Sequence, residues 1–268
     1  MTLLALDGAG EWTAATVGGK AVGLGRLAGL GLPVPEARVL PADAHARWLE
    51  AGRLAREDLD GLRAAAGELP PPLAVRSSAT DEDAADRSAA GQYESVMGVE
   101  GVDALLAAVE ACYRSAQGDR ARAYRDGGHA LVALVIQHEV RSGRSGVAFS
   151  VDPVSGAGDS VLIEAVFGHG EGIVAGDVTP DRYAVARDGA PIRARRAAKE
   201  ALADGRGALH ALPAERRLAR VLSDEDARRV AEVVRRAEAG FGRPVDVEFC
   251  FERTELWAVQ CRPITTLP

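Results

Sequence analysis

The sequence predicts an α+β fold, in which helices and strands are mixed without a repeating βαβ unit. Helical patterns dominate the first half of the chain, and the second half is rich in strand patterns. The chain closes with two alternating segments, VDVEFCFE and LWAVQCR, which a short turn near Arg253 and Thr254 separates as in a β-hairpin. A doubly wound parallel sheet would require helices and strands in regular alternation, which this order does not provide.

The first half is expected to hold three helices and one short strand. The first helix follows Gly18 and Gly19, carries apolar residues on one face, and is stopped by Gly31. The strand ends at Arg76-Ser77-Ser78, and a polar, acidic loop follows it to about Gly91. The expected helices are residues 18–30, 43–66 and 103–125, and the strand is 73–75.

Four strands and one helix are expected between this region and the closing hairpin. Ser223 is the expected N-cap of the helix, because three acidic residues follow it in the first turn, where the helix dipole favours negative charge. This helix should end at Gly240. The expected strands are residues 131–137, 146–151, 160–166 and 181–186.

Composition narrows the class of protein. The 268 residues are 47% hydrophobic and 26% charged, as in ordinary globular proteins, and no apolar run approaches the roughly 20 residues that span a bilayer. The formal charge of −7 argues against a nucleic-acid partner, and the basic stretch 187–220 is expected to be a solvated face. Three cysteines without CxxC spacing and an N-terminus without a basic leader favour a cytoplasmic protein without a membrane partner.

Two familiar phosphate-binding motifs are excluded. A P-loop would need a glycine at Ala14 and a hydroxyl residue at Ala21, next to Lys20. A dinucleotide fingerprint beginning at Gly168 would need a third glycine where Ile173 stands. Lys20 itself is notable, because only two of the 32 basic residues are lysines and this one follows two glycines.

A different set of residues is suited to a nucleotide. Lys20 and Arg76 each end a glycine- or serine-rich turn, as cations that clamp phosphate would. Gly91 and Ser95 could offer backbone N–H groups and a hydroxyl to phosphate oxygens. Each residue has a plainer alternative: Arg76 could pair with a nearby aspartate, and Gly91 could be an ordinary turn.

The closing hairpin supplies acid, amide and guanidinium groups. If residues 253–255 form a three-residue loop, Glu248 lies opposite Gln260, and Asp246 lies opposite Arg262. That face would offer two oxygen ligands for Mg²⁺ and a cation for phosphate. A two-residue loop would slip the register and move Gln260 to the other face, and a plain surface role for Glu248 is the alternative.

These motifs together resemble the N-terminal ATP-binding domain of the phosphoenolpyruvate synthase and pyruvate phosphate dikinase family, which rifampicin phosphotransferase shares. The resemblance runs through residues 17–265 and implies an ATP-grasp-type fold of two lobes with the nucleotide between them. It further implies a single domain, residues 1–268, with lobes of about 1–125 and 126–268. The matching stretches are VGGKAVGLGRLAGLGLPVP, LAVRSSATDED, AAGQYESVMGVEG, SGVAFSVDPVSG, GHGEGIVAGDVTPDRY and GRPVDVEF…VQCRPIT.

The resemblance also implies roles for residues that bind phosphate. Lys20 and Arg76 should contact ATP phosphates, and Gly91 and Ser95 should belong to the phosphate loop. Arg262 should stabilise charge on the transferring phosphates. Lys20, Arg76 and Arg262 are thus the expected catalytic residues.

The hinge and the metal site complete the set implied by the family. Gln137, Glu139 and Val140 should lie in the adenine hinge, where backbone groups read the base. Glu248 and Gln260 should bind Mg²⁺. Glu139 stands where the family commonly has methionine, which leaves the ligand set of the phosphates intact.

The family's reaction needs a part that this sequence does not show. In that family the ATP domain passes the β-phosphate to a histidine on a swivelling domain, releasing AMP and phosphate, and the histidine then phosphorylates a small molecule. None of the five histidines here follows Thr-Ser or Thr-Cys as in the family's signature, and His169, in GHGE, is expected to be a packing residue. The expected partner is therefore a separate phospho-histidine protein, unless the chain is a fragment.

Two alternatives of other classes remain at this point. The first is a stand-alone ATP-grasp ligase or kinase that acts directly on a carboxylate or hydroxyl and yields ADP. The second is a nucleotide sensor without catalysis, which the presence of Lys20, Arg76, Glu248, Gln260 and Arg262 disfavours.

Overall fold

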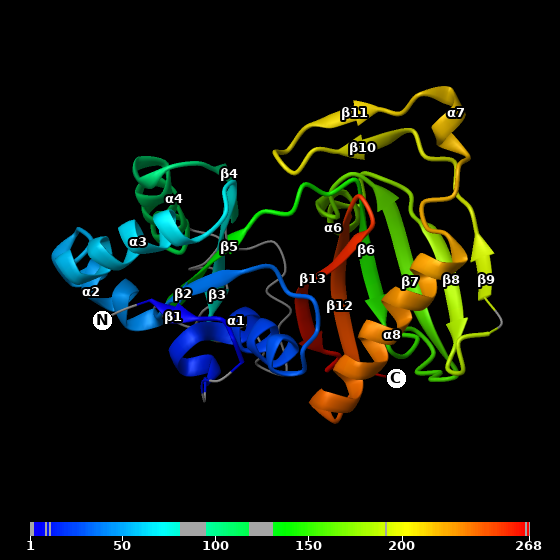
Figure 1. Ribbon diagram of the computed structural model, residues 1–268, viewed down its shortest axis with the longest axis horizontal. Helices are drawn as coiled ribbons and strands as arrows, with labels where there is room; N and C mark the ends of the chain where they lie inside the picture. Colours follow the sequence, from blue (N-terminus) through cyan, green and yellow to red (C-terminus); the bar gives the residue numbers. More distant parts are fainter. Residues whose placement is uncertain are drawn as a thin grey trace. The chain divides into compact units, whose positions relative to one another are not determined.

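The computed structural model describes residues 3–8, 10, 12–80, 95–117, 131–190, 192–265 and 267. The chain divides into two compact units (Figure 1). Unit 1 comprises Met1–Gly29 and Pro35–Glu139, and unit 2 comprises Leu30–Val34 and Val140–Pro268. The expected lobes divide at residue 125 instead, and strand β5 (Val132–His138) accounts for the difference because it is hydrogen-bonded into the sheet of unit 1.

Unit 1 is built on a five-stranded antiparallel sheet. The order is β1-β2-β5-β3-β4, so that β5, which follows the others in sequence, lies at the centre. The central position of β5 explains its continuous apolar sequence, because both of its faces are buried. The remaining strands are β1 (Leu4–Ala5), β2 (Ala37–Leu40), β3 (Leu73–Ala79) and β4 (Ser95–Val99).

In the described part of unit 1, four helices pack on this sheet. Helix α1 (Ala14–Gly29) lies against β3 and β5, and the core between the sheet and the other three helices contains Trp48, Leu62, Val109 and Tyr113. These helices are α2 (Ala42–Ala51), α3 (Arg56–Glu68) and α4 (Val102–Ser115).

Two expected elements of unit 1 are corrected by the structure. The single helix 43–66 is two helices, because Gly52 adopts a left-handed conformation (φ 67°) and ends α2. The expected strand 73–75 is longer, since β3 continues through Arg76-Ser77-Ser78 to Ala79. The polar serines extend the strand because their backbone pairs with β5.

Unit 2 holds a six-stranded antiparallel sheet with the order β13-β12-β6-β7-β8-β9. Together with unit 1 it confirms the α+β class. One of the four expected strands, 131–137, is β5 of unit 1. The other three lie in this sheet, together with the closing hairpin and one additional edge strand. Their bounds are β6 (Arg144–Phe149), β7 (Ser160–Phe167), β8 (Asp181–Ala186), β9 (Ile192–Arg195), β12 (Val245–Glu252) and β13 (Glu255–Pro263).

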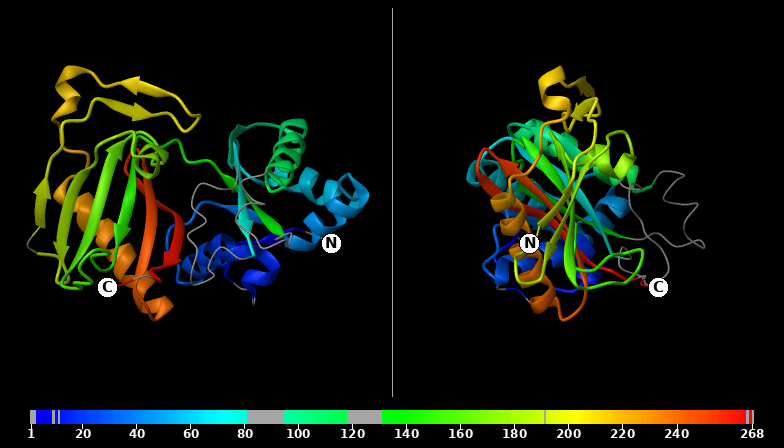
Figure 2. Two further views of the ribbon diagram at one scale, coloured as in Figure 1. Left: turned by 180° about the vertical axis from the view of Figure 1, so that it is seen from behind. Right: turned by 90° about the vertical axis from the view of Figure 1, so that its right-hand side faces the viewer.

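Helix α8 (Asp224–Phe241) covers one face of this sheet (Figure 1). It begins with the expected cap: the Ser223 side chain accepts the N–H of Asp226, and the Asp226 carboxylate accepts the N–H of Ser223. Arg229 of α8 lies over the ring of Phe251, so the alternate residues Val247, Phe249 and Phe251 face the helix. No described helix of unit 2 crosses the opposite face (Figure 2).

The segment between β9 and α8 forms a separate small layer of unit 2. Its two-stranded sheet bridges to Gly168 at the end of β7. None of the helices in the described part of the chain has the length and apolar character needed to cross a bilayer. The elements are β10 (Ala201–Ala203), β11 (Leu209–Ala211), α7 (Ala214–Arg217) and, after β7, α6 (Glu171–Ala175).

A buried ion pair attaches this layer to the sheet. Lys199 Nζ lies 2.6 Å from Asp181 Oδ1, with 2% and 0% of the two side chains exposed. The Asp181 carboxylate also accepts the N–H groups of Ala197 (2.8 Å) and Val221 (2.9 Å). One carboxylate therefore joins both ends of the segment to the start of β8.

Replacing Lys199 by Met should destabilise the protein by about 3–5 kcal/mol, because it leaves a buried carboxylate without its countercharge. The free energy of unfolding from urea titration is the measurement. The matched control is Arg193→Met on the exposed edge strand β9, which should change stability by less than about 0.5 kcal/mol. Equal effects of the two changes would contradict the assigned role of the ion pair.

Candidate functional site

Three of the expected nucleotide-binding residues share one face of the unit 1 sheet. Arg76 lies opposite Ser95 in β4 and opposite Val135 in β5, and Gln137 follows Val135 by two residues. Side chains alternate between the faces of a strand, so Arg76, Ser95 and Gln137 are on the same side. The neighbouring Val75 points to the other side, into the core under α2, α3 and α4.

The start of helix α1 brings Lys20 to strand β3. Gly18 has φ 76°, and a Cβ there would lie 2.2 Å from the Ser78 carbonyl oxygen, so the close approach requires glycine. The Ser78 hydroxyl accepts the N–H of Ala21 at 3.1 Å, and Lys20 Nζ donates to the Ser77 carbonyl at 2.8 Å. The ammonium group is thereby fixed beside the strand that carries the expected phosphate-binding arginine.

The backbone of the expected hinge is partly committed to unit 1. The N–H of His138 donates to the Glu36 carbonyl, and the N–H of Glu139 donates to the Pro72 carbonyl, both at 2.8 Å. For the N–H of Val140, no acceptor lies among the described residues. Of these three donors, Val140 is the one available to a base.

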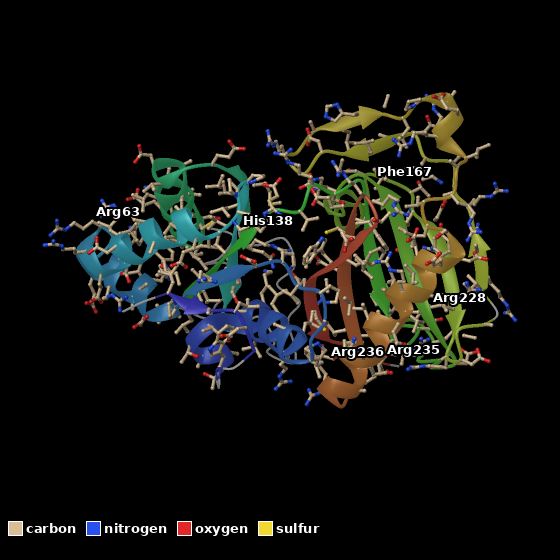
Figure 3. The ribbon with its side chains drawn as sticks, in the orientation of Figure 1. Arg63, His138, Phe167, Arg228, Arg235 and Arg236 are labelled. Atoms are coloured by element: carbon tan, nitrogen blue, oxygen red, sulfur yellow. The ribbon has the colours of Figure 1, made fainter. Side chains whose placement is uncertain are left out.

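Side chains around the hinge also bond within unit 1. Gln137 is 2% exposed, and the Glu139 carboxylate accepts the N–H of Gly98 in β4. The half-buried His138, labelled in Figure 3, donates from Nδ1 to the Pro70 carbonyl at 2.8 Å. The hinge is therefore tied by Glu139 to the strand that begins with Ser95.

The hairpin of unit 2 pairs Glu248 with Gln260 and Asp246 with Arg262, as expected. The turn is different, because Glu252 pairs with Glu255 and the loop has two residues. A bulge restores the register: Phe249 lies opposite Ala258 while Glu248 lies opposite Gln260, so Val259 is the extra residue. Without this bulge, the two-residue turn would put Gln260 on the face that packs against α8.

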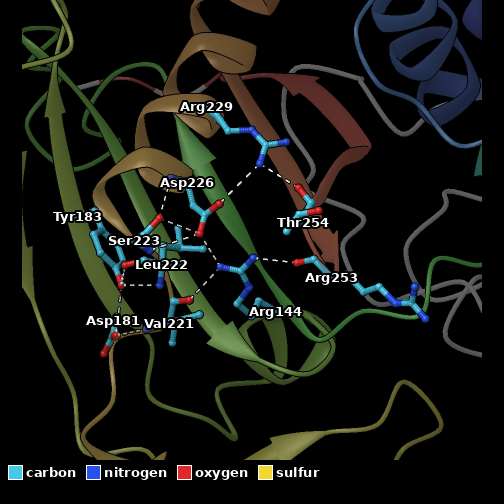
Figure 4. A network of polar contacts seen from close by, with 10 residues as sticks. All are labelled: Arg144, Asp181, Tyr183, Val221, Leu222, Ser223, Asp226, Arg229, Arg253 and Thr254. Atoms are coloured by element: carbon cyan, nitrogen blue, oxygen red, sulfur yellow. Dashed lines mark hydrogen bonds and ion pairs between the residues drawn. The ribbon is translucent and has the colours of Figure 1, made fainter.

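Two arginines hold the short turn (Figure 4). Arg144 donates to the carbonyl of Arg253 at 3.0 Å, and Arg229 donates to the carbonyl of Thr254 at 2.8 Å. Both arginines lie on the Asp226 carboxylate, Arg144 at 2.6 Å and Arg229 at 3.6 Å. Arg253 has φ 54°, an unfavourable conformation for a residue other than glycine, which these contacts help to maintain.

The charge of Asp226 suits this role. Burial opposes its ionisation, but hydrogen bonds from Arg144 and Ser223 outweigh burial and hold the pKa of Asp226 below its usual range. The carboxylate that anchors the turn is therefore ionised at neutral pH.

Asp246 is the residue of this face to which the sequence pattern assigned no function. It is 8% exposed, and its Oδ2 accepts the Nε–H of Arg262 at 2.9 Å. Its Oδ1 is buried and has no hydrogen-bond partner among the described residues. Burial raises the pKa of Asp246, against the attraction of Arg262. A buried carboxylate oxygen without a hydrogen bond costs free energy. Such unsatisfied groups are common at sites where a ligand supplies the missing partner.

The donor set on this face fits a magnesium ion. Glu248 and Gln260 place a carboxylate and an amide oxygen directly across from each other, and the free oxygen of Asp246 lies one row away on the same face. The described residues contain no cluster of three His, Cys, Asp or Glu side chains that would make an all-protein site. Mg²⁺ commonly takes one or two carboxylates and completes its shell with water and substrate phosphates.

The described histidines all have structural surroundings. His45 is 1% exposed in the unit 1 core, and His210 lies 3.0 Å from Asp204. The ring of His169 packs against Gly205, where an added Cβ would come within 2.5 Å of it. Two residues of interest, Gly91 and His129, lie outside the described residues.

The expected site residues thus fall into two groups, one on a sheet face of each unit. The family model described as "Pyruvate phosphate dikinase, AMP/ATP-binding domain" matches residues 56–268 of the chain. The chain belongs to this family. Membership confirms the resemblance read from the motifs and agrees with an α+β fold of the ATP-grasp type.

Relatives of this AMP/ATP-binding domain extend along most of the chain. A probable phosphoenolpyruvate synthase of Methanocaldococcus jannaschii is 32% identical over 93% of the chain and 25% of its own length. A rifampicin phosphotransferase of Streptomyces sviceus is 34% identical over 96% of the chain and 35% of its own length. The prodigiosin synthesizing transferase PigC of Serratia marcescens is 32% identical over 93% and 32%. The chain spans about a quarter to a third of the length of these relatives.

Replacing Asp246 by Asn should raise the melting temperature at pH 7. The pKa of this carboxyl is raised in the folded protein, so its contribution to stability is lost as pH rises through the interval between the ordinary and the raised value. The neutral amide removes that penalty, and the gain should vanish near pH 3, where both states are protonated.

Asp204→Asn is the control of opposite sign. A hydrogen bond from His210 and two backbone N–H groups lower the pKa of Asp204 to about 2, so this carboxylate adds stability above its ordinary pKa. The control variant should melt at a lower temperature at pH 7. An Asp246→Asn protein that also melts lower would contradict the assigned burial of an unsatisfied charge.

Proposed function

We propose that this domain is a Mg-ATP-dependent phosphotransferase module that gives a phosphoryl group to a histidine on a swivelling domain, with AMP and phosphate as products. The observation that carries the proposal is the face of the unit 2 hairpin. There an unsatisfied buried oxygen of Asp246 lies beside the Glu248–Gln260 pair and Arg262. Membership in an AMP/ATP-binding domain family supports the choice of nucleotide.

Unit 1 is proposed to hold phosphate, and the hinge that follows it is proposed to read the base. Lys20 and Arg76 supply positive charge to the phosphate oxygens, and Ser95 adds a hydroxyl donor on the same sheet face. Gly91 remains a proposed member of the phosphate loop. At the hinge, the N–H of Val140 donates to the base.

Two further hinge residues act through position. The Gln137 side chain is buried. The Glu139 carboxylate accepts the N–H of Gly98 and so fixes the hinge to β4. The residue before Val140 is thereby fixed to the strand that begins with Ser95.

Unit 2 is proposed to hold the metal ion and the charge that develops on transfer. Glu248 and Gln260 would bind Mg²⁺, with Asp246 beside them, and the ion would neutralise phosphate oxygens. Arg262 is anchored by Asp246 through its Nε–H and is 45% exposed, so that its guanidinium reaches the surface of this face. It is proposed to stabilise negative charge in the transition state.

The transfer balances as follows. An imidazole nitrogen of the acceptor histidine attacks the β-phosphorus, the bond from that phosphorus to the oxygen of AMP breaks, and the imidazole proton passes to solvent. The histidine then carries the β- and γ-phosphoryl groups together. Water cleaves the bond between them and releases the γ-phosphate as inorganic phosphate. The net reaction converts ATP, water and histidine into AMP, phosphate and phospho-histidine, which phosphorylates a small molecule.

The acceptor histidine is proposed to lie outside residues 1–268, in the same polypeptide or in another. The described histidines are occupied by core packing or by backbone and carboxylate contacts. The relatives are about three to four times longer than this chain and are named as a probable phosphoenolpyruvate synthase, a prodigiosin synthesizing transferase and a rifampicin phosphotransferase. The identity of the final phosphoryl acceptor is therefore proposed to depend on polypeptide regions outside this domain.

Incubation with Mg-ATP and a candidate histidine-domain protein should yield AMP and inorganic phosphate in equal amounts, together with an acid-labile phosphoprotein. Chromatography of the nucleotides and the acid stability of the label are the measurements. ADP formation that depends on a small carboxylate or hydroxyl substrate, without a protein partner, would instead show a kinase or ligase acting directly.

Glu248→Gln should weaken Mg-dependent ATP binding and turnover by more than the roughly 10–100-fold lost when an outer-shell metal residue is changed. Titration with Mg²⁺ at fixed ATP is the measurement. Glu252→Gln, on the same strand and sheet face but at the turn, is the matched control and should keep its Mg²⁺ dependence. Unchanged turnover of the Glu248 variant would refute the metal assignment.

A further inference from the structure

The hairpin face that carries the proposed metal ligands has two different ends. At one end Asp246 pairs with Arg262, which is suited to phosphate. At the other end lies the turn, where the chain leading from the hinge enters the sheet: Gly143 donates to the carbonyl of Phe251 at 3.0 Å. Val140, the proposed base-reading residue, precedes Gly143 by three residues and belongs to the same unit. A nucleotide on this face would thus have its phosphates toward Arg262 and its nucleoside toward the turn.

Trp257 stands at the nucleoside end of the face. It lies directly opposite Cys250, which follows Glu248 by two residues and so points to the same side. On β12 the row of Trp257 lies two residues beyond the row of Gln260, a rise of about 7 Å. The indole is on the side of the sheet that no described helix of unit 2 crosses.

The bulge at Val259 is the reason for this placement. With a three-residue loop and no bulge, Glu248 would still face Gln260, but Trp257 would lie opposite Phe251 and point toward α8. The two-residue turn, held by Arg144 and Arg229, followed by the bulge, moves the indole to the ligand face and leaves the metal pair unchanged.

The indole nitrogen has an unmet requirement. Trp257 Nε1 is buried and has no hydrogen-bond acceptor among the described residues. Burying a donor without a partner costs about 1–3 kcal/mol. Cross-strand pairing with Cys250 explains the side of the sheet on which the ring lies but not the unsatisfied N–H. The other unsatisfied atom of this hairpin, Asp246 Oδ1, lies on the same face. Each end of the face therefore carries one buried polar atom without a hydrogen-bond partner among the described residues.

We propose that Trp257 is a nucleotide-binding residue whose indole N–H donates a hydrogen bond to an acceptor on the nucleoside of ATP. The inference rests on the proposed function, since it takes the Glu248–Gln260 pair as the position of the phosphates. Trp257 contributes to affinity for the nucleoside and not to binding of the metal ion.

Calorimetric titrations with Mg-ATP and with Mg-tripolyphosphate test the role of Trp257. Trp257→Phe keeps an aromatic ring and removes the donor, so ATP should bind about three- to tenfold more weakly. Tripolyphosphate lacks the nucleoside, and its affinity should stay the same. Trp48→Phe, in the core of unit 1, is the matched control and should bind both ligands as the unchanged protein does.

A third titration identifies the acceptor. If the loss caused by Trp257→Phe disappears with 2′-deoxy-ATP, the ribose hydroxyl accepts the hydrogen bond, and if the loss persists, the acceptor is elsewhere on the nucleoside. ATP should also change the tryptophan fluorescence of the unchanged protein and of Trp48→Phe, but not that of Trp257→Phe.

Two results would overturn the inference alone. One is an unchanged ATP affinity in Trp257→Phe, and the other is an equal loss of affinity for ATP and tripolyphosphate. A failure of the unchanged protein to bind ATP at all would overturn the proposed function, and this inference with it.

Discussion

The pairing of β12 with β13 is the constraint on which the proposed chemistry depends. A strand has a side-chain period of two, so a shift of one residue would move Gln260 away from Glu248 and separate the oxygens proposed to bind Mg²⁺. The chain fixes this register at three places: the two-residue turn, the bulge at Val259 and the Asp246–Arg262 pair. Asp226 connects the first of these to α8 through Arg144 and Arg229.

In unit 1 the proposed site depends on the close approach of helix α1 to strand β3, whereas in unit 2 it depends on the register of β12 and β13. Gly18 lets the backbone of α1 approach Ser78 closely enough for a hydroxyl–amide hydrogen bond, and the same approach sets Lys20 on the carbonyl of Ser77. Any side chain at position 18 would displace the helix from the strand. Backbone geometry thus contributes to the position of the cation.

Much of this arrangement could be predicted from local sequence, and the exceptions have physical reasons. The apolar period of α1, the acids after Ser223 and the alternation in the hairpin determine those elements directly. The pairing of Glu248 with Gln260 was also predicted, but through a three-residue loop. The structure reaches it by a shorter turn and a bulge, which depend on arginines distant in sequence. The break at Gly52 was missed because the Ala-rich pattern continues across it.

Burial was the main property that sequence could not supply. The ion pair of Lys199 with Asp181 and the unsatisfied oxygen of Asp246 both result from packing between segments far apart in the chain. In the sequence, Lys199 is distinguished only as the second of two lysines, and Asp246 only as the expected cross-strand partner of Arg262. A crystal structure of the domain with Mg-ATP would test the central assignment most directly. We expect the ion at about 2.0–2.1 Å from oxygens of both Glu248 and Gln260. An ion held by other side chains, with the Glu248–Gln260 face empty, would contradict it.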